Sequence, residues 1–176
     1  MKNFNILLLL VIGLLAGTQS FAQSFQKGDK IVNLGVGVGG LGANVTGEYG
    51  IAENIGVGAF LAYERRTYSY LFGTLGDNYG RNEITVGARV AYHAGELLNI
   101  GEKFDPYVAA GLGVWIYTNP YADYSVARGE YLSRSYTLPS FLFRIGTRYA
   151  LSDKLNVFGD IGSGGSWIQG GVSFKF

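Results

Sequence analysis

The sequence predicts an all-β protein: an eight-stranded antiparallel up-and-down transmembrane β-barrel. Three observations predict this fold. Stretches in which apolar residues alternate with small or polar ones recur along the chain, as in strands with one apolar face. Eight such stretches can be counted, and bacterial membrane barrels have an even number of strands. The last stretch, Ile168–Phe176, keeps the alternation up to a final Phe.

The first four predicted strands share one design, with aliphatic residues on one face and mainly Gly, Ala, Thr, Asn or a single charge on the other. Polar segments separate them, including a short turn at Ala52–Asn54 and a long aromatic loop at Arg65–Arg81. The four strands are Ile31–Gly39, Ala43–Ile51, Ile55–Glu64 and Asn82–His93.

The second four strands repeat the alternation. A connection at Ala94–Asp105 leads into them, and within it Glu96–Asn99 fits one helical turn at most. The longest loop, Tyr117–Pro139, and a turn at Ser152–Asp153 divide them. Strands of about ten residues match the ~9–11 residues of a tilted membrane-spanning strand. The four are Tyr107–Ile116, Ser140–Ala150, Leu155–Ile161 and Ser166–Phe176.

The N-terminus has the features of a secretory signal peptide. Lys2 precedes an unbroken apolar run at Ile6–Ala16, and Ser20-Phe21-Ala22 is a small-x-small cleavage site. The run is too short for a membrane-spanning helix, which needs roughly 20 apolar residues. We therefore expect residues 1–22 to be a cleaved signal peptide and residues 23–176 to form the barrel domain.

The amino-acid composition excludes several classes of site and function. The chain has no Cys, which excludes a lipoprotein anchor, disulfides and thiolate metal sites. It has 14 Lys and Arg against 13 Asp and Glu, and loss of Lys2 with the signal peptide balances them. A neutral chain has no overall attraction to nucleic acid. The 28 Gly and 13 Tyr, with only 3 Pro, favour closely packed strands.

An alternation of apolar and polar residues with a period of two also fits a soluble β-barrel. The strand faces opposite the aliphatic residues decide between a soluble and a membrane barrel. Those faces carry Gly, Ala, Thr and Ser with a few charges and large rings such as Phe60, Phe158 and Trp167. This is a poor surface for water but a suitable filling for a narrow lumen, where small residues make room for large ones. An eight-stranded barrel is just filled by its side chains.

The aromatic residues fall at two levels when the N-terminus is placed on the periplasmic side. Such levels are the interfacial girdles of a membrane barrel. The periplasmic level would hold Tyr49, Tyr92, Tyr107, Tyr149, Phe174 and Phe176, and the outer level Tyr63, Trp115, Phe141, Phe143 and Trp167. Within the outer level, Trp115 and Trp167 have the parity of the interior face.

The signal peptide, eight strands, short periplasmic turns, longer outer loops and terminal Phe174-Lys175-Phe176 resemble the small OmpX/OmpA-type outer-membrane β-barrels over the whole mature chain. The resemblance implies a bacterial outer-membrane location, contact with outer-membrane lipid including lipopolysaccharide, and recognition of Phe174 and Phe176 by the barrel insertion machinery. It identifies an architecture, not an activity.

Charged residues fall on the predicted interior face. In a narrow lumen they should pair, because an unpaired buried charge costs several kcal/mol. We expect Arg144 and Asp160 to be neighbours across the Ser152–Asp153 turn, and Glu48, Arg148 and Lys175 all to lie low in the barrel, toward the periplasmic end. The alternative is a selectivity lining for a pore. The interior set is Glu48, Glu64, Arg89, Arg144, Arg148, Asp160 and Lys175.

No motif indicates catalysis, a cofactor or a metal. Residues Gly35–Gly40 match G-x-G-x-x-G, but they lie in a strand and no helix follows, as a dinucleotide site requires. Some outer-membrane barrels modify lipid A with a catalytic His and Ser near the outer leaflet. His93, the single His, falls at the periplasmic end, and no second His or Cys can complete a metal site.

The two long loops hold eight of the 13 Tyr residues. Tyr and Arg are common at binding hot spots, so the loops are a candidate contact surface. The alternative is that strands continue into these loops and their Tyr residues pair. We expect a non-enzymatic barrel acting in adhesion or in a membrane complex, with a narrow porin-like channel or a lipid A-modifying enzyme as alternatives. The candidate residues are Tyr68, Tyr70, Tyr79, Tyr121, Tyr124, Arg128, Tyr131, Arg134 and Tyr136.

Overall fold

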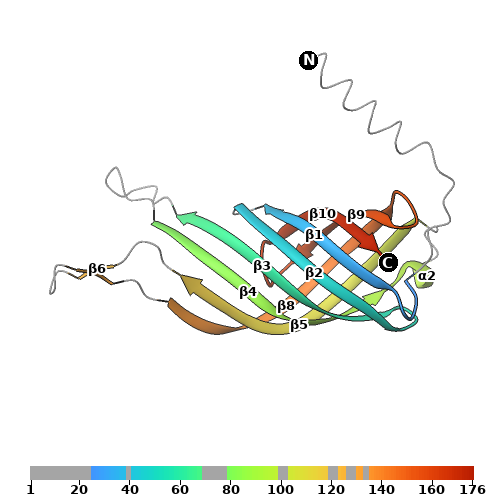
Figure 1. Cartoon of the computed structure of the whole chain (residues 1–176), viewed down its shortest axis with the longest axis horizontal. Coiled ribbons are helices and arrows are strands. Elements are labelled where there is room, and N and C mark those ends of the chain that lie inside the picture. The colour runs from blue at the N-terminus through green and yellow to red at the C-terminus, as the bar shows by residue number, and fades with distance from the viewer. Residues whose placement is uncertain are drawn as a thin grey trace, which may run out of the picture.

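The computed structural model describes residues 25–38, 41–68, 79–98, 103–118, 123–125, 130–132 and 135–176. Eight antiparallel strands close into a barrel in the order β1-β10-β9-β8-β5-β4-β3-β2, which confirms the predicted fold class (Figure 1). The barrel strands are β1 (Lys30–Val38), β2 (Leu41–Ala52), β3 (Ile55–Tyr68), β4 (Tyr79–His93), β5 (Phe104–Thr118), β8 (Ser135–Ala150), β9 (Leu155–Gly162) and β10 (Ile168–Lys175).

Two smaller elements mark the opposite ends of the barrel. The helix α2 (Gly95–Leu98), a single turn at the predicted place, lies beside the C-terminus at what we call the termini end (Figure 1). The ribbon of β6 (Asp123–Ser125) and β7 (Glu130–Leu132) lies beyond the other end, the loop end. Within the described residues, no helix has the length and apolar character needed to cross a membrane.

The first and last strands close the barrel. β1 pairs with β10 from Ile31↔Lys175 to Val38↔Ile168, and the Phe176 amide donates a hydrogen bond to the Lys30 carbonyl at 2.9 Å. Closure pairs the backbone groups that an open sheet edge would expose, as a membrane requires.

The strands have unequal lengths. β3, β4, β5 and β8 have 14 to 16 residues, whereas β9 and β10 have eight each. Pairing continues to Tyr68↔Tyr79 and to Thr118↔Ser135, so four strands project beyond β9 and β10 at the loop end (Figure 1). We call this projection the outer wall. The predicted loops were too long, because these segments mix polar and aromatic residues on both faces and carry little periodic signal.

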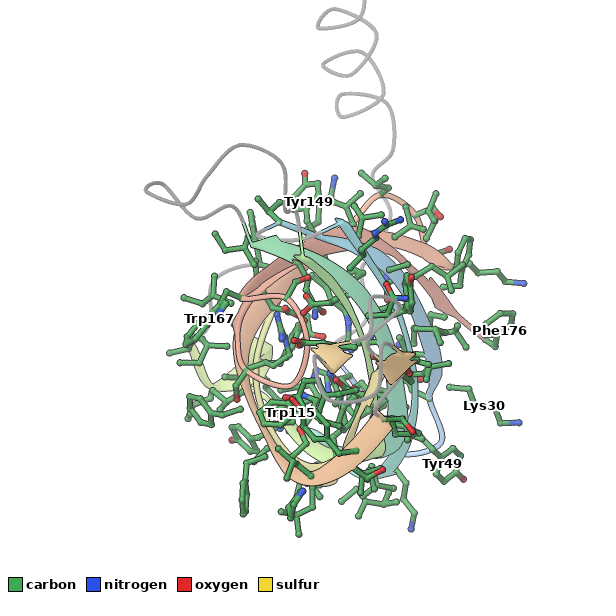
Figure 2. All side chains as sticks on the ribbon, turned by 90° about the vertical axis from the view of Figure 1, so that its left-hand side faces the viewer. Lys30, Tyr49, Trp115, Tyr149, Trp167 and Phe176 are labelled. Carbon is green, nitrogen blue, oxygen red and sulfur yellow. The ribbon has the colours of Figure 1, made fainter. Side chains whose placement is uncertain are left out.

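The alternation places aliphatic side chains outside and polar side chains inside. Outward residues such as Val36, Leu112 and Ile161 are more than half exposed, whereas the inward Asn33 and Ser173 are buried. Figure 2, which looks along the barrel, shows side chains radiating from the wall as well as filling the lumen. This distribution is the reverse of a soluble protein and suits a hydrocarbon environment.

Two aromatic residues differ from their predicted places. Tyr107 was expected in the periplasmic girdle, but it is 2% exposed and lies in the barrel interior, as its parity with Ala109 and Gly111 requires. Trp167 was expected to have interior parity, but it is 68% exposed and points outward (Figure 2). The reason is that positive φ angles at Gly164 and Gly165 turn the chain before β10 begins.

Except for Trp115, the other girdle residues point outward at the expected levels; Trp115 lies on the interior face with its buried register partner Thr85, as its parity predicts (Figure 2). Tyr49 and Tyr149 lie near the termini end, opposite Lys30 and Phe104 in register, and Tyr149 makes an edge-on contact with Phe104 at 4.9 Å between ring centroids. Phe141 and Phe143 are exposed on β8 nearer the loop end. The apolar surface is therefore bracketed by aromatic rings, as interfacial girdles are.

Glycines make room for rings in the lumen. A Cβ atom added to Gly87 would lie 2.8 Å from Phe60 Cε1, and one added to Gly35 would lie 2.8 Å from Phe158 Cζ. The interior of the eight-stranded barrel is filled in this way, with large and small residues on neighbouring strands. Trp167, which was expected to use this space, does not occupy it.

Candidate functional site

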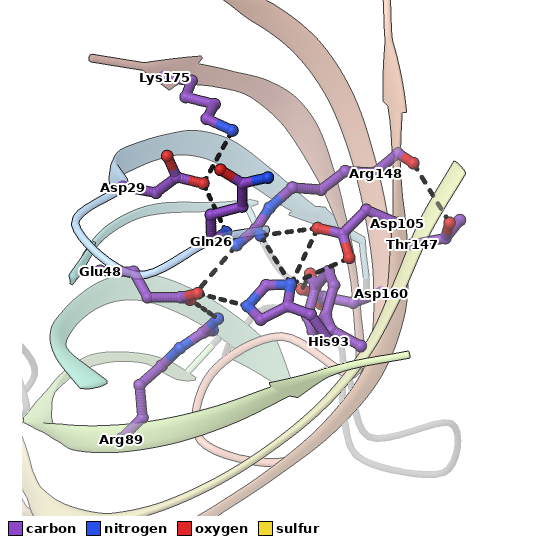
Figure 3. Close-up of polar contacts among 11 residues, drawn as sticks. Gln26, Asp29, Glu48, Arg89, His93, Asp105, Thr147, Arg148, Asp160 and Lys175 are labelled. Carbon is purple, nitrogen blue, oxygen red and sulfur yellow. Dashed lines mark hydrogen bonds and ion pairs between the residues drawn. The ribbon is translucent and has the colours of Figure 1, made fainter. Parts of the chain in front are cut away.

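Five charged or ionisable side chains meet inside the barrel near the termini end. We call them the His93 cluster: Glu48 from β2, Arg89 and His93 from β4, Asp105 from β5 and Arg148 from β8 (Figure 3). His93 Nε2 lies 2.6 Å from Glu48 Oε1, and His93 Nδ1 lies 2.8 Å from Asp105 Oδ2. The imidazole thus connects the two carboxylates.

Two guanidinium groups balance these carboxylates. Arg89 Nη2 donates to Glu48 Oε2 at 2.7 Å, and Arg148 contacts Glu48 Oε2 at 3.3 Å and Asp105 Oδ2 at 3.2 Å. All members except Asp105 are almost fully buried. Charge-assisted hydrogen bonds in such a place are strong only while every partner stays in position.

A second buried group lies further along the lumen. Arg144 Nε donates to Asp160 Oδ1 at 2.6 Å, and the Tyr107 hydroxyl donates to Asp160 Oδ2 at 2.6 Å. Arg144 also donates to the main-chain oxygens of Ser163 and Ser166. The register places Asp160 diagonally from Arg144, because Arg144 pairs with Gly162 and Asp160 with Gly146.

The two remaining interior charges lie at opposite ends. The Ser166 hydroxyl donates to Glu64 across the lumen near the loop end, and the register partner of Glu64 is the buried Glu83. Lys175 lies low in the barrel, as expected, where it lines a cavity together with Arg148, and its Nζ pairs with Asp29 at 2.7 Å. Asp29 precedes the first predicted strand, so strand parity could not place it.

The structure adds residues that the sequence did not single out. His93 has the same strand parity as the predicted interior residue Arg89, yet its two carboxylate partners were not foreseen. Asp105 was assigned to a connection, whereas β5 begins at Phe104 and places Asp105 opposite Arg148. Extending the alternation of β5 by two residues would have placed both Asp105 and Tyr107 on the interior face.

The lumen around the His93 cluster has little free space. A cavity of about 40 Å³ lies between Phe25, Asp105, Arg148 and Lys175. That volume holds only a few water molecules. In the part of the chain that the structure describes, no group of three His, Cys, Asp or Glu side chains is arranged to hold a metal ion.

The described parts of the Tyr-rich segments form paired strands. Tyr136, which is exposed, stacks on its register partner Tyr117 at 4.8 Å between ring centroids. Tyr68 pairs with Tyr79, and Tyr124 with Tyr131, in backbone register. These pairs match the alternative in which strands extend the barrel. Tyr70, Tyr121, Arg128 and Arg134 lie outside the described residues.

The terminal aromatic residues point away from the barrel. Phe174 is partly exposed on β10, and Phe176 is 74% exposed at the termini end (Figure 2). Their role as an insertion signal stays a prediction.

No family model and no curated protein matches the chain. Several solved structures are similar to it, among them those of two bacterial proteins. One is the N-terminal β-barrel domain of OprF from Pseudomonas aeruginosa, with a TM-score of 0.56, 17% identity, and coverage of 86% of this chain and 98% of that one. The other is Ail, the attachment invasion locus protein of Yersinia pestis, with a TM-score of 0.50, 16% identity, and coverage of 86% and 100%. In strand order, closure and length, the chain has the fold of the small eight-stranded outer-membrane β-barrels of the OmpX/OmpA type.

Proposed function

We propose that this protein is a non-enzymatic integral outer-membrane β-barrel that acts at the cell surface through its outer wall. The termini end would face the periplasm and the loop end the exterior. The aliphatic outer surface bracketed by aromatic rings supports a location in lipid, including lipopolysaccharide on the outer side. The exposed Phe176 and Phe174 support recognition by the barrel insertion machinery.

One observation carries the surface role: four strands continue past the others at the loop end and carry paired tyrosines. Tyr136 and the nearby Leu138 are exposed there, and Tyr136 stacks on the buried Tyr117. Rigid Tyr rings supply large contact area at low cost in conformational entropy, as in many binding surfaces. The similarly folded Ail is named as an attachment invasion locus protein.

The lumen supports this proposal over a channel or an enzyme. A channel needs a continuous path, but ion pairs and rings fill the interior from the His93 cluster to Glu64. An enzyme needs a reachable nucleophile or base, and His93 is 1% exposed at the end away from the outer wall.

Display of the chain in the outer membrane of a bacterial host tests the proposal. We expect the host to gain adherence to immobilised heparin, matrix proteins or epithelial cells, and the Tyr117→Ala/Tyr136→Ala double variant to lose most of it. Tyr49→Ala/Tyr92→Ala at the termini end is the matched control and should adhere like wild type. Equal adherence of all three proteins and the empty host would contradict the surface role, provided that surface labelling shows equal display.

A further inference from the structure

The segment just before β1 folds across the mouth of the barrel at the termini end. The Phe25 ring, 4% exposed, stacks on the imidazole of His93 with 3.8 Å between centroids and 7° between planes. Phe25 thereby covers the His93 cluster on the side that faces out of the mouth. It lines both the small cavity beside Arg148 and a wider one, about 340 Å³, beside Glu53 and Glu96.

Main-chain hydrogen bonds hold this segment on β2 and on the turn that follows it. The Gly28 amide donates to the Gly50 carbonyl and the Gly50 amide donates to the Asp29 carbonyl, both at 2.8 Å. The Asn54 amide donates to the Phe25 carbonyl at 3.4 Å. A Cβ atom at Gly50 would overlap the Gln26 carbonyl oxygen, so the close approach of the segment requires glycine there.

Side chains hold it on the other flank of β1. The Asp29 carboxylate accepts a hydrogen bond from the main-chain amide of Gln26 at 2.8 Å. It also pairs with Lys175 Nζ at 2.7 Å (Figure 3). Lys175 belongs to β10, the last strand. The segment therefore bridges β2 and β10, which lie on the two sides of β1, and reaches His93 on β4.

We propose that residues 25–29 are a plug that seals the termini-end mouth and keeps water and solutes away from the His93 cluster. Two arguments support a sealing role. Phe25 lines both the small cavity beside Arg148 and the wider opening, and a flat ring stacked on an imidazole excludes water from that face. The ion pairs beneath it are strong only in a dry, low-dielectric site. The plug is independent of any binding by the outer wall.

A thiol-labelling experiment tests the plug, because the chain has no Cys and a single introduced one reports one position. Ile31→Cys places the thiol in the small cavity beneath Phe25. We expect it to react slowly with a membrane-impermeant trimethylammonium methanethiosulfonate, measured by mass shift on the folded protein. Adding Phe25→Ala should raise the rate at least tenfold, and the exposed Lys27→Cys should react equally fast with and without Phe25→Ala.

Two glycine variants keep the test valid if Phe25→Ala fails to fold. Gly50→Ala should displace the plug sterically and raise the labelling rate of Ile31→Cys, whereas Gly47→Ala has nothing within 4 Å of its new Cβ and should leave it unchanged. A gel mobility that changes on heating serves as the check that each variant is folded. Fast labelling of Ile31→Cys with Phe25 in place, or an unchanged rate in folded Phe25→Ala and Gly50→Ala, would overturn the proposal.

Discussion

At the scale of single residues, the stability of the barrel interior depends on charged side chains that contact one another instead of water. Burying an ion pair brings little net stability, but removing one partner leaves an uncompensated charge that costs about 3–5 kcal/mol. The seven predicted interior charges differ in how many partners they have. Glu48 contacts three side chains, whereas Lys175 near the surface contacts one.

Arg144→Leu should destabilise the barrel. The change leaves the Asp160 carboxylate without its guanidinium and leaves two main-chain oxygens without donors. We expect the free energy of unfolding in detergent to fall by about 3–5 kcal/mol. Lys154→Leu, on an exposed turn, is the control and should change it by less than about 0.5 kcal/mol. Equal unfolding curves for both variants would contradict the structural role of Arg144.

Glu48→Gln tests the His93 cluster with the smallest change of shape. It removes the charge that faces Arg89, Arg148 and His93, so two guanidinium groups lose a common partner. We expect a loss of roughly 3 kcal/mol or more in a denaturant titration. Glu53→Gln makes the same change at an exposed turn and should leave the free energy of unfolding unchanged. A similar small effect at both positions would show that the cluster is dispensable.

At the scale of elements, strand length and edge chemistry shape the loop end. Among the described strands, β8 pairs with β9 only from Arg144 onward, so its outer half has a strand partner on one side. Pro139, which has no amide hydrogen, stands in that half, and the Ser163 hydroxyl donates to the Phe141 carbonyl and accepts from the Phe143 amide. Proline and side-chain caps blunt an edge against unwanted pairing.

Glycine spacing between β4 and β5 also belongs to this scale. Gly87→Ala would push a Cβ against Phe60 and against the backbone of β5. Overpacking of this kind costs about 1–3 kcal/mol of unfolding free energy, which chemical denaturation in detergent measures. Gly159→Ala, whose Cβ would lie 3.8 Å from the nearest atom, is the matched control and should be neutral. A neutral Gly87→Ala would mean that the lumen is looser than the contacts indicate.

At the scale of the whole molecule, the apolar outer surface indicates that hydrocarbon, rather than water, surrounds the barrel. Leu112 is 65% exposed at the middle of β5, a position that would cost stability in water and gains it in hydrocarbon. Leu112→Arg should lower the unfolding free energy in lipid vesicles by about 2–4 kcal/mol. Thr118→Arg, at the loop end of the same strand, should change it by at most about 1 kcal/mol. Comparable costs at both positions would argue against a membrane belt at Leu112.

The sequence by itself determined the number of barrel strands, which face of each strand is apolar, and that the seven predicted charges lie on the interior face. The reason is that an alternation with a period of two residues is a local property that each strand displays independently. The tertiary structure decided two matters that no local pattern contains. Lys175 pairs with Asp29, and Phe25 reaches His93 from outside every predicted strand. Each depends on which strands become neighbours on closure, and therefore on contacts between residues that lie far apart in the chain.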